Sequence, residues 1–333
     1  MTAASRRSGS ASSPMDERAF HAWLVRALPS GSRGPLPLGD DAAALKLPRG
    51  SVAVVSTDAL VEGTHFLRSS PPRLVGRAAS AVSLSDLAAK GATPLAVFLA
   101  IVVPRDSPRA WAERLVLEAE AEAARFGAHV LGGDTKPGPT RTVVSTVVGA
   151  APRSRLVGRT GARPGDALVT TGEVGRGGAA ALALQGAGAP RQRAVTGLLR
   201  VRPRVREGVV LARYAHAMLD TSDGIAESAR LLAAASRVRV VVVEGALPLA
   251  PVVRRIRSAA RRRAAAFYGG DYELLAAVPP GRLGVATRAV RGVGGRLTRI
   301  GSIARGRGAL LLTDRGPKPM PEAGWRPFPR RPR

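Results

Sequence analysis

Cysteine is absent from this chain of 333 residues, and its absence removes several classes of protein at once. Without thiols there is no disulfide framework, no thiolate zinc site, no iron–sulfur ligation and no cysteine nucleophile. The four histidines also show no spacing that is typical of a zinc site. Any catalysis by this chain must therefore use oxygen and nitrogen side chains.

Aromatic residues and long apolar runs are also scarce. Aromatics make up only 4% of the chain, which supplies few surfaces on which nucleic-acid bases can stack. The longest nearly apolar run, residues 94–104, is about half of the ~20 residues that a membrane-spanning helix needs, and residues 1–14 contain no apolar signal core. These features predict a cytoplasmic protein with no membrane and no specific nucleic acid as a partner.

Acidic residues are few: the chain has 24 acidic and 51 basic residues, which gives a net charge of +27. Only four of the basic residues are lysine, which leaves 47 arginines. Together with abundant Ala, Gly and Pro, this bias is typical of GC-rich coding sequences, so the charge is weak evidence for a nucleic-acid partner. Residues 254–263 hold six arginines. They fit either a polyanion-binding surface or, as we favour, the solvated face of a helix.

Short β-branched segments alternate with helical ones along the middle of the chain. Expected strands are 52–56, 96–103, 142–148, 167–171, 238–244 and 273–278, and expected helices include 111–126 and 225–235. This alternation predicts layered α/β and α+β architecture. We expect a disordered tail at 1–14, an N-terminal ATP- and metal-binding domain over 15–152, a C-terminal domain over 153–325 and a basic, proline-rich tail at 326–333.

The aspartates are strongly clustered. Eight of the twelve lie in six short segments rich in Gly, Ser and Thr, namely 39–43, 56–58, 85–86, 132–135, 220–224 and 269–273. Carboxylates that converge in a fold repel one another unless cations lie between them, and hard oxygen ligands suit Mg²⁺. The pattern therefore predicts that the protein binds a polyphosphate carried on several Mg²⁺ ions.

Each segment also has a purely structural interpretation. An Asp before a helix is a common N-cap worth ~1 kcal/mol, and Asp223 ahead of the expected helix at 225–235 fits that description. Asp86 and Lys90 lie four residues apart on an expected helix and fit a surface ion pair. Six such segments in one acid-poor chain favour the metal interpretation.

Common nucleotide-binding motifs are absent from the sequence. There is no G-x-x-x-x-G-K-[ST] loop, no G-x-G-x-x-G after a strand and no protein-kinase motif set. No recognisable Ser/His/Asp catalytic triad is present in the sequence either. A nucleotide would therefore be held by carboxylate-bound metal ions and by helix N-termini.

Seven motifs occur in one order between residues 38 and 275: GDDAA, STDALVEGTHF, SLSDLAAKGATPL, GGDTKPG, RTGARPGD, LDTSDG and GGDYELL. With these motifs in this order, the chain resembles the thiamine-monophosphate kinase family. A weaker similarity to the family lies at Gly324–Trp325. The resemblance implies the two-domain fold of the aminoimidazole ribonucleotide synthetase-like ATP enzymes, with an N-terminal mixed sheet that pairs across a homodimer and a C-terminal α+β domain. The apolar run at 96–103 also suggests a dimer, because it would be a liability as an exposed edge strand.

The resemblance further implies direct transfer of a phosphoryl group from ATP to thiamine monophosphate, the last step of thiamine diphosphate biosynthesis. Such a reaction needs no general base, because the phosphate nucleophile is already ionised and the protein need only hold two anions in line. ATP is then a co-substrate and several Mg²⁺ ions are the cofactors.

The resemblance also implies roles for individual residues. Positions that match metal ligands are Asp41, Ser56, Thr57, Asp58, Asp86, Asp134, Asp220 and Asp223. Positions that match nucleotide contacts are Gly133, Asp134, Arg159 and Ser222, and those that match substrate contacts are His65, Gly270 and Trp325. Asp41, Asp86 and Arg159 are the expected catalytic residues. Plainer interpretations remain for Arg159 as a solvated charge, His65 as a half-buried ring and Trp325 as part of a frayed tail.

Two positions depart from the family pattern. Lys90 stands where the family usually has Met, and Gly270 replaces a glutamate that is associated with the substrate. Selenophosphate synthetase and the hydrogenase-maturation ATPase share this superfamily, but they use a reactive Cys or selenocysteine that this chain lacks. The alternative function is a related ATP-dependent synthetase of the superfamily that acts on another phosphate or amide.

Overall fold

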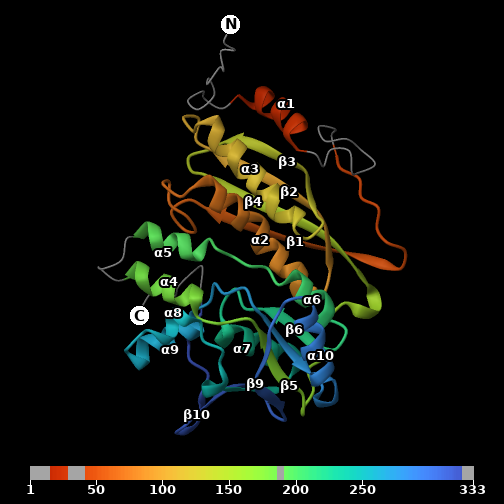
Figure 1. Ribbon diagram of the computed structural model, residues 1–333, viewed down its shortest axis with the longest axis vertical. Helices are drawn as coiled ribbons and strands as arrows, with labels where there is room; N and C mark the ends of the chain where they lie inside the picture. Colours follow the sequence, from red (N-terminus) through yellow and green to blue (C-terminus); the bar gives the residue numbers. More distant parts are fainter. Residues whose placement is uncertain (1–15, 29–41, 186–190, 325–333) are drawn as a thin grey trace, which may run out of the picture.

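The computed structural model describes residues 16–28, 42–185 and 191–324. The first part of the chain contains α1 (Glu17–Ala27), β1 (Ser51–Val61), α2 (Pro72–Lys90), β2 (Thr93–Val103), α3 (Arg109–Ala124), β3 (His129–Pro137) and β4 (Thr142–Pro152). The four strands form a sheet in the order β1-β4-β2-β3, in which β2 and β3 are parallel and the other neighbours antiparallel (Figure 1). Helices α2 and α3 pack against one face of this sheet.

The second part of the chain builds a larger mixed sheet. Its strands are β5 (Ala167–Thr171), β6 (Ala217–Asp220), β7 (Arg239–Val243), β8 (Leu274–Val278), β9 (Leu297–Ala304), β10 (Gly308–Thr313) and β11 (Gly316–Pro319), in the order β11-β10-β7-β9-β5-β8-β6. The helices are α4 (Arg176–Gln185), α5 (Arg191–Leu198), α6 (Val205–Leu211), α7 (Ile225–Ser236), α8 (Pro251–Arg254), α9 (Ala259–Tyr268) and α10 (Pro280–Gly292).

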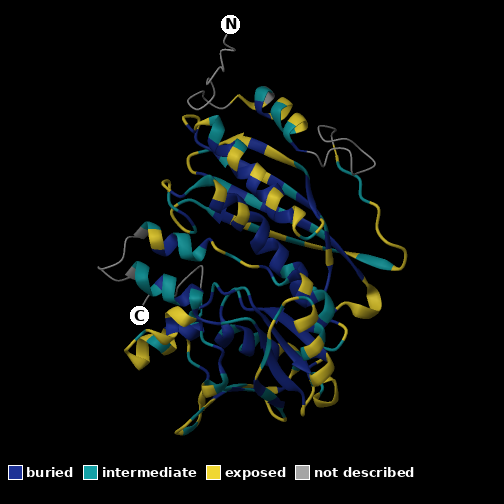
Figure 2. Cartoon of the chain, viewed as in Figure 1, coloured by how far each residue is buried: buried dark blue, intermediate teal, exposed yellow. Residues whose placement is uncertain are grey.

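Helix α2 connects the two sheets. Fourteen of its 19 residues are buried, so it is a core helix rather than an amphipathic surface helix. Small residues allow this close packing: a Cβ on Gly76 would lie 2.1 Å from the carbonyl oxygen of Leu115 in α3, and a Cβ on Gly208 in α6 would lie 2.2 Å from that of Ala88. One apolar core therefore runs from the four-stranded sheet through α2 to β6 and β8 (Figure 2).

The predicted fold class is confirmed, but the argument for a dimer from the apolar run at 96–103 does not hold. Residues 96–103 belong to β2, which lies inside the sheet between β4 and β3, so this apolar run is not an exposed edge. The edge strands are β1 and β3. The expected strands lack β3, β6, β9, β10 and β11. In β3, residues Gly132, Gly133 and Asp134 are typical of a turn and conceal the strand.

No helix in the described ranges combines the length and the hydropathy that crossing a bilayer requires. The expected tails at 1–14 and 326–333 lie outside the described residues, and the division into domains at residue 152 stays a prediction.

Candidate functional site

A cavity of about 420 Å³ lies beside the C-terminal half of α2, where elements of both sheets meet. Ala78, Val82 and Asp86 line it at intervals of one helical turn, so they lie along one face of α2 and span about 12 Å. Along this axis the lining changes from apolar to acidic. The apolar residues include Ala181, Leu184, Leu198, Leu199 and Val201, and the polar ones Asp58, Asp220, Ser222 and Asp223.

Three serine hydroxyls hold the carboxylates of the acidic end. Ser56 Oγ donates to Asp86 Oδ2 at 2.5 Å and so joins β1 to α2. Ser85 Oγ donates to Asp220 Oδ2 at 2.8 Å, and Ser222 Oγ donates to Asp220 Oδ1 at 3.0 Å. Strand β1, helix α2 and the end of β6 thus position one group of carboxylates, which we call the acidic cluster: Asp58, Asp86, Asp220 and Asp223.

The acidic cluster carries more negative charge than its surroundings neutralise. Burial, followed by the negative charge of Asp86, raises the pKa of Asp220 to about 6. The same two causes, in the same order, raise the pKa of Asp58 to about 6. The pKa of Asp223 is also raised, first by burial and then by Glu227. A cation placed among these groups would relieve the repulsion.

The chemistry of the cluster fits a hard divalent cation. Oδ2 of Asp58 is buried and has no hydrogen-bond partner in the described part of the chain, so a metal ion would satisfy an otherwise unpaired acceptor. Within residues 16–28, 42–185 and 191–324, however, no three His, Cys, Asp or Glu side chains are already arranged around one point as a ligand set. Asp41, a predicted ligand, lies outside those ranges.

Two cationic side chains lie near the acidic cluster. Lys90 Nζ donates to the carbonyl oxygen of Met218 on β6 at 3.3 Å. Lys90 forms no ion pair with Asp86 in the described structure, so the alternative interpretation of these two residues as a surface ion pair is wrong. The pKa of Lys90 is lowered by burial and then by Arg159, whose own charge lowers the pKa of Asp223. Arg159 is exposed but lies close enough to act on the site.

The His65 ring lines the same cavity. The backbone N–H of Val61 donates to Nδ1 of His65 at 3.0 Å, and burial lowers the pKa of His65. The ring is therefore neutral near pH 7, with its proton on Nε2, where it can donate a hydrogen bond.

Asp223 is not the N-cap of α7, so the purely structural interpretation of this residue is wrong. The residue before Ile225 is Gly224, which occupies the N-cap position with φ of 95°. Asp223 instead faces the cavity together with Gly270, whose φ is 78°.

Other predicted site residues lie apart from this cluster. The Thr57 hydroxyl is on the opposite face of β1, within 2.8 Å of Thr146 Oγ1. Gly133 and Asp134 lie on β3 and line a second cavity, of about 430 Å³, beneath α1. Gly133 has a structural reason to be glycine, because a Cβ there would lie 1.9 Å from the Leu99 carbonyl oxygen.

Asp134 is exposed and pairs with Lys136 Nζ at 2.7 Å, and that hydrogen bond is the main cause of its lowered pKa. Trp325 lies outside the described residues.

Among the cavity and cluster residues that the sequence predictions miss are Ser85, Tyr268 and Tyr272. Ser85 and Tyr272 are inside the quoted motifs, but nothing in the sequence indicates that Ser85 would hold a carboxylate of a distant strand. Tyr268 has no motif signal, because it ends an ordinary-looking helix.

Family models and curated relatives match this chain over most of its length. Residues 39–151 match the AIR synthase related protein, N-terminal domain, and residues 163–311 match the C-terminal domain of the same family. Thiamine-monophosphate kinase of Halobacterium salinarum is 39% identical over 303 residues, which cover 90% of this chain and 99% of that protein. The Caulobacter vibrioides enzyme of the same name is 35% identical over 307 residues, covering 90% and 87%.

Solved structures share the fold. Thiamine-monophosphate kinase from Stenotrophomonas maltophilia superposes with a TM-score of 0.78 at 29% identity, covering 86% of this chain and 95% of that one. A structure described as AaThiL complexed with AMPPCP and TMP has a TM-score of 0.72 at 27% identity, covering 94% and 99%. The hydrogenase maturation protein HypE in complex with ATP has a TM-score of 0.72 but only 21% identity, covering 90% and 93%, and shares the fold alone. This chain belongs to the thiamine-monophosphate kinase family of AIR synthase related proteins.

Proposed function

We propose that this protein transfers the γ-phosphoryl group of ATP to the phosphate of thiamine monophosphate, which gives ADP and thiamine diphosphate. The bond between the γ-phosphorus and its bridging oxygen breaks, and a bond from an oxygen of the acceptor phosphate forms. The relatives named thiamine-monophosphate kinase and the ATP-analogue complex support the proposal. The observation in this chain that supports the proposal most strongly is the cavity, whose lining changes from apolar to acidic along α2.

The shape of the cavity suits a phosphomonoester of an apolar, ring-containing alcohol. Ala78, Val82 and Leu198 would contact the ring system, and the phosphate would lie toward Asp86 and Asp220. A volume of about 420 Å³ is within the range of small-molecule sites. The neutral ring of His65 lines the same cavity.

Mg²⁺ belongs to the proposal as the cation of the acidic cluster. Asp58, Asp86 and Asp220 would hold it, together with the residues that the resemblance adds, Asp41 and Asp223. When bound, Mg²⁺ offsets the negative charge of two phosphate groups that must approach each other. The residues of the chain contribute the positioning: Ser56 fixes Asp86, and Ser85 and Ser222 fix Asp220. Arg159 adds a positive charge on the solvent side.

A homodimer is also part of the proposal. Asp134 on β3 and Asp58 on β1 occupy opposite edges of the four-stranded sheet, which places them about three strand spacings, or ~14 Å, apart within one chain. A second copy would bring its own β3 edge toward the Asp58 cluster. The sheet face away from α2 and α3 is apolar at Val55, Phe98 and Val148, and Val55 is 59% exposed. Such a face favours association with a second sheet. Light scattering at micromolar concentration tests this part of the proposal, and a monomer would contradict it.

The substrate is tested by comparing acceptors side by side. Thiamine monophosphate, thiamine and an aminoimidazole-pathway ribonucleotide are each incubated with Mg²⁺ and ATP, and ADP release and phosphorylated product are both measured. We expect product only from thiamine monophosphate. Turnover of the ribonucleotide alone would favour the related synthetase function instead.

A further inference from the structure

Tyr272 has an unfavourable backbone conformation at the cavity. Its φ is 55°, and among the described non-glycine residues only Arg237 shares a positive φ. Arg237 is the ordinary left-handed C-cap of α7. Tyr272 lies in neither a helix cap nor a hairpin turn. A bulky side chain in the left-handed region is disfavoured, and such residues cluster at functional sites.

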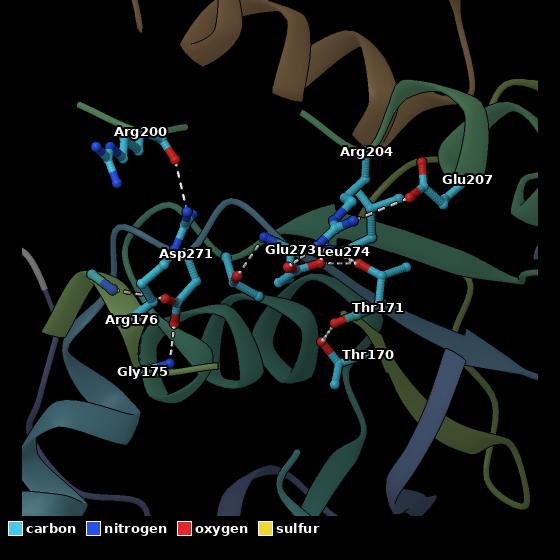
Figure 3. A network of polar contacts seen from close by, with 12 residues as sticks. Thr170, Thr171, Gly175, Arg176, Arg200, Arg204, Glu207, Asp271, Glu273 and Leu274 are labelled. Atoms are coloured by element: carbon cyan, nitrogen blue, oxygen red, sulfur yellow. Dashed lines mark hydrogen bonds and ion pairs between the residues drawn. The ribbon is translucent and has the colours of Figure 1, made fainter. Parts of the chain in front are cut away.

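Both sequence neighbours of Tyr272, Asp271 and Glu273, are anchored by buried polar contacts (Figure 3). Asp271 accepts hydrogen bonds from the backbone N–H groups of Gly175, at 2.5 Å, and Gly177, at 2.9 Å, where α4 begins. Glu273 accepts from Arg204 through Nε at 2.7 Å and through a second guanidinium nitrogen at 2.5 Å.

Thr171 Oγ1 also donates to Glu273, at 2.7 Å. Asp271 and Glu273 are each only 3% exposed. Both carboxylates are thus occupied by structural contacts and are not available to a ligand, whereas the residue between them lines the cavity.

The side chain of Tyr272 lines the cavity beside the acidic cluster. Its pKa is raised by burial first and then by the negative charges of Asp220, Asp58, Asp223 and Asp86, in that order. No hydrogen bond within the described part of the chain engages its hydroxyl. A tyrosine hydroxyl near neutral pH is protonated in any case, so the cavity contains a neutral O–H donor without a protein partner among these acids.

We propose that the Tyr272 hydroxyl donates a hydrogen bond to the phosphate of the bound acceptor and so fixes that phosphate at the acidic end of the cavity. This inference rests on the proposed function. A neutral donor has a specific advantage at this position, because it can hold a phosphate oxygen without neutralising the carboxylates that a metal ion needs. An arginine or lysine in the same place would compete with the metal ion for Asp58 and Asp220.

The test is Tyr272→Phe, which removes the hydroxyl and keeps the ring that packs against the core. We expect kcat/KM for thiamine monophosphate to fall about 10- to 100-fold, as for loss of a hydrogen bond to a charged group, with the KM for ATP unchanged within twofold. The matched control is Tyr214→Phe, since Tyr214 packs against the same core and does not line the cavity. We expect the control to keep wild-type kinetics within twofold.

A second measurement separates this inference from the proposed function and from a structural role. Melting temperatures are recorded with Mg²⁺ alone and with Mg²⁺ plus inorganic phosphate. Phosphate should stabilise the wild-type protein and Tyr214→Phe but not Tyr272→Phe, while the melting temperatures without phosphate stay within about 2 °C of one another.

If the wild-type protein does not phosphorylate thiamine monophosphate, the proposed function is wrong and the phosphate measurement alone decides the role of Tyr272. Equal stabilisation of all three proteins by phosphate, or of none, would overturn the inference, as would unchanged kinetics in Tyr272→Phe. A lower melting temperature of Tyr272→Phe with phosphate stabilisation intact would assign Tyr272 a structural role and also overturn it.

Discussion

Ser56 Oγ lies 2.5 Å from Asp86 Oδ2, so an edge strand of one sheet orients a carboxylate on the helix that connects both sheets. Asp86 also lines the cavity, so its orientation matters to the site. Ser56→Ala should therefore leave Asp86 present but poorly oriented. We expect kcat/KM for the kinase reaction to fall about tenfold, the size of one hydrogen bond to a charged group.

The control for this change is Thr146→Ala, which removes a hydroxyl from the neighbouring strand β4 on the face away from the cavity. It should leave kcat/KM within twofold of wild type. Equal losses in Ser56→Ala and Thr146→Ala would mean that the sheet, and not the orientation of Asp86, is affected.

Stabilisation by Mg²⁺ should depend on pH. The pKa values of Asp58 and Asp220 rise from 3.8 to about 6 on folding, so their contribution to stability is fully present below pH 3.8 and is lost as the pH rises through about 6. Above that pH the repelling carboxylates are ionised, and bound Mg²⁺ would offset the repulsion. The melting temperature should thus rise with Mg²⁺ at pH 7.5 and change little at pH 5.

In Asp58→Asn and Asp220→Asn the difference between the two pH values should shrink. A rise in melting temperature with Mg²⁺ that is equal at pH 5 and pH 7.5 would show that the ion binds somewhere other than among these carboxylates.

Lys90 should weaken the binding of Mg²⁺. Its ammonium group already supplies positive charge to Asp220 and Asp86, as their effect on its pKa shows, and it is held by the Met218 carbonyl. Replacing it by the uncharged Met of similar length should lower the Mg²⁺ concentration that gives half-maximal activity by severalfold. Calorimetric titration of Lys90→Met with Mg²⁺ would measure the same change directly. Lys318→Met, at an exposed position on β11, is the control. A higher Mg²⁺ requirement in Lys90→Met would show that the ammonium supports the ion instead.

Gly270→Glu introduces the carboxylate that the family resemblance associates with the substrate, but it also puts a side chain at a φ of 78°. That conformation costs about 1–2 kcal/mol for a residue with a Cβ, so the variant should be less stable than wild type. Gly270→Ala shares the backbone cost without the carboxylate. We expect a lower KM for thiamine monophosphate in Gly270→Glu than in Gly270→Ala, with equal KM values for ATP. Equal KM values for both substrates would show that a carboxylate at this position has no contact with the acceptor.

The sequence motifs predicted the fold class, and seven of the residues that they singled out line one cavity. They could not predict which face of β1 would carry Thr57, since this depends on the register of a strand pair far apart in the chain. Nor could they show that Asp271 and Glu273 are structural, because their partners Gly175 and Arg204 lie about 70 to 100 residues away in the sequence. The strained Tyr272 is visible only in the backbone angles.

We propose that Asp86 and its neighbours catalyse phosphoryl transfer from ATP to thiamine monophosphate. The most direct measurement is the rate at which wild type and Asp86→Asn form thiamine diphosphate and ADP with Mg²⁺ present. We predict equal amounts of the two products from wild type, and a rate at least 100-fold lower in Asp86→Asn with the melting temperature unchanged or higher. ADP without thiamine diphosphate from wild type, or a near wild-type rate in Asp86→Asn, would contradict the claim.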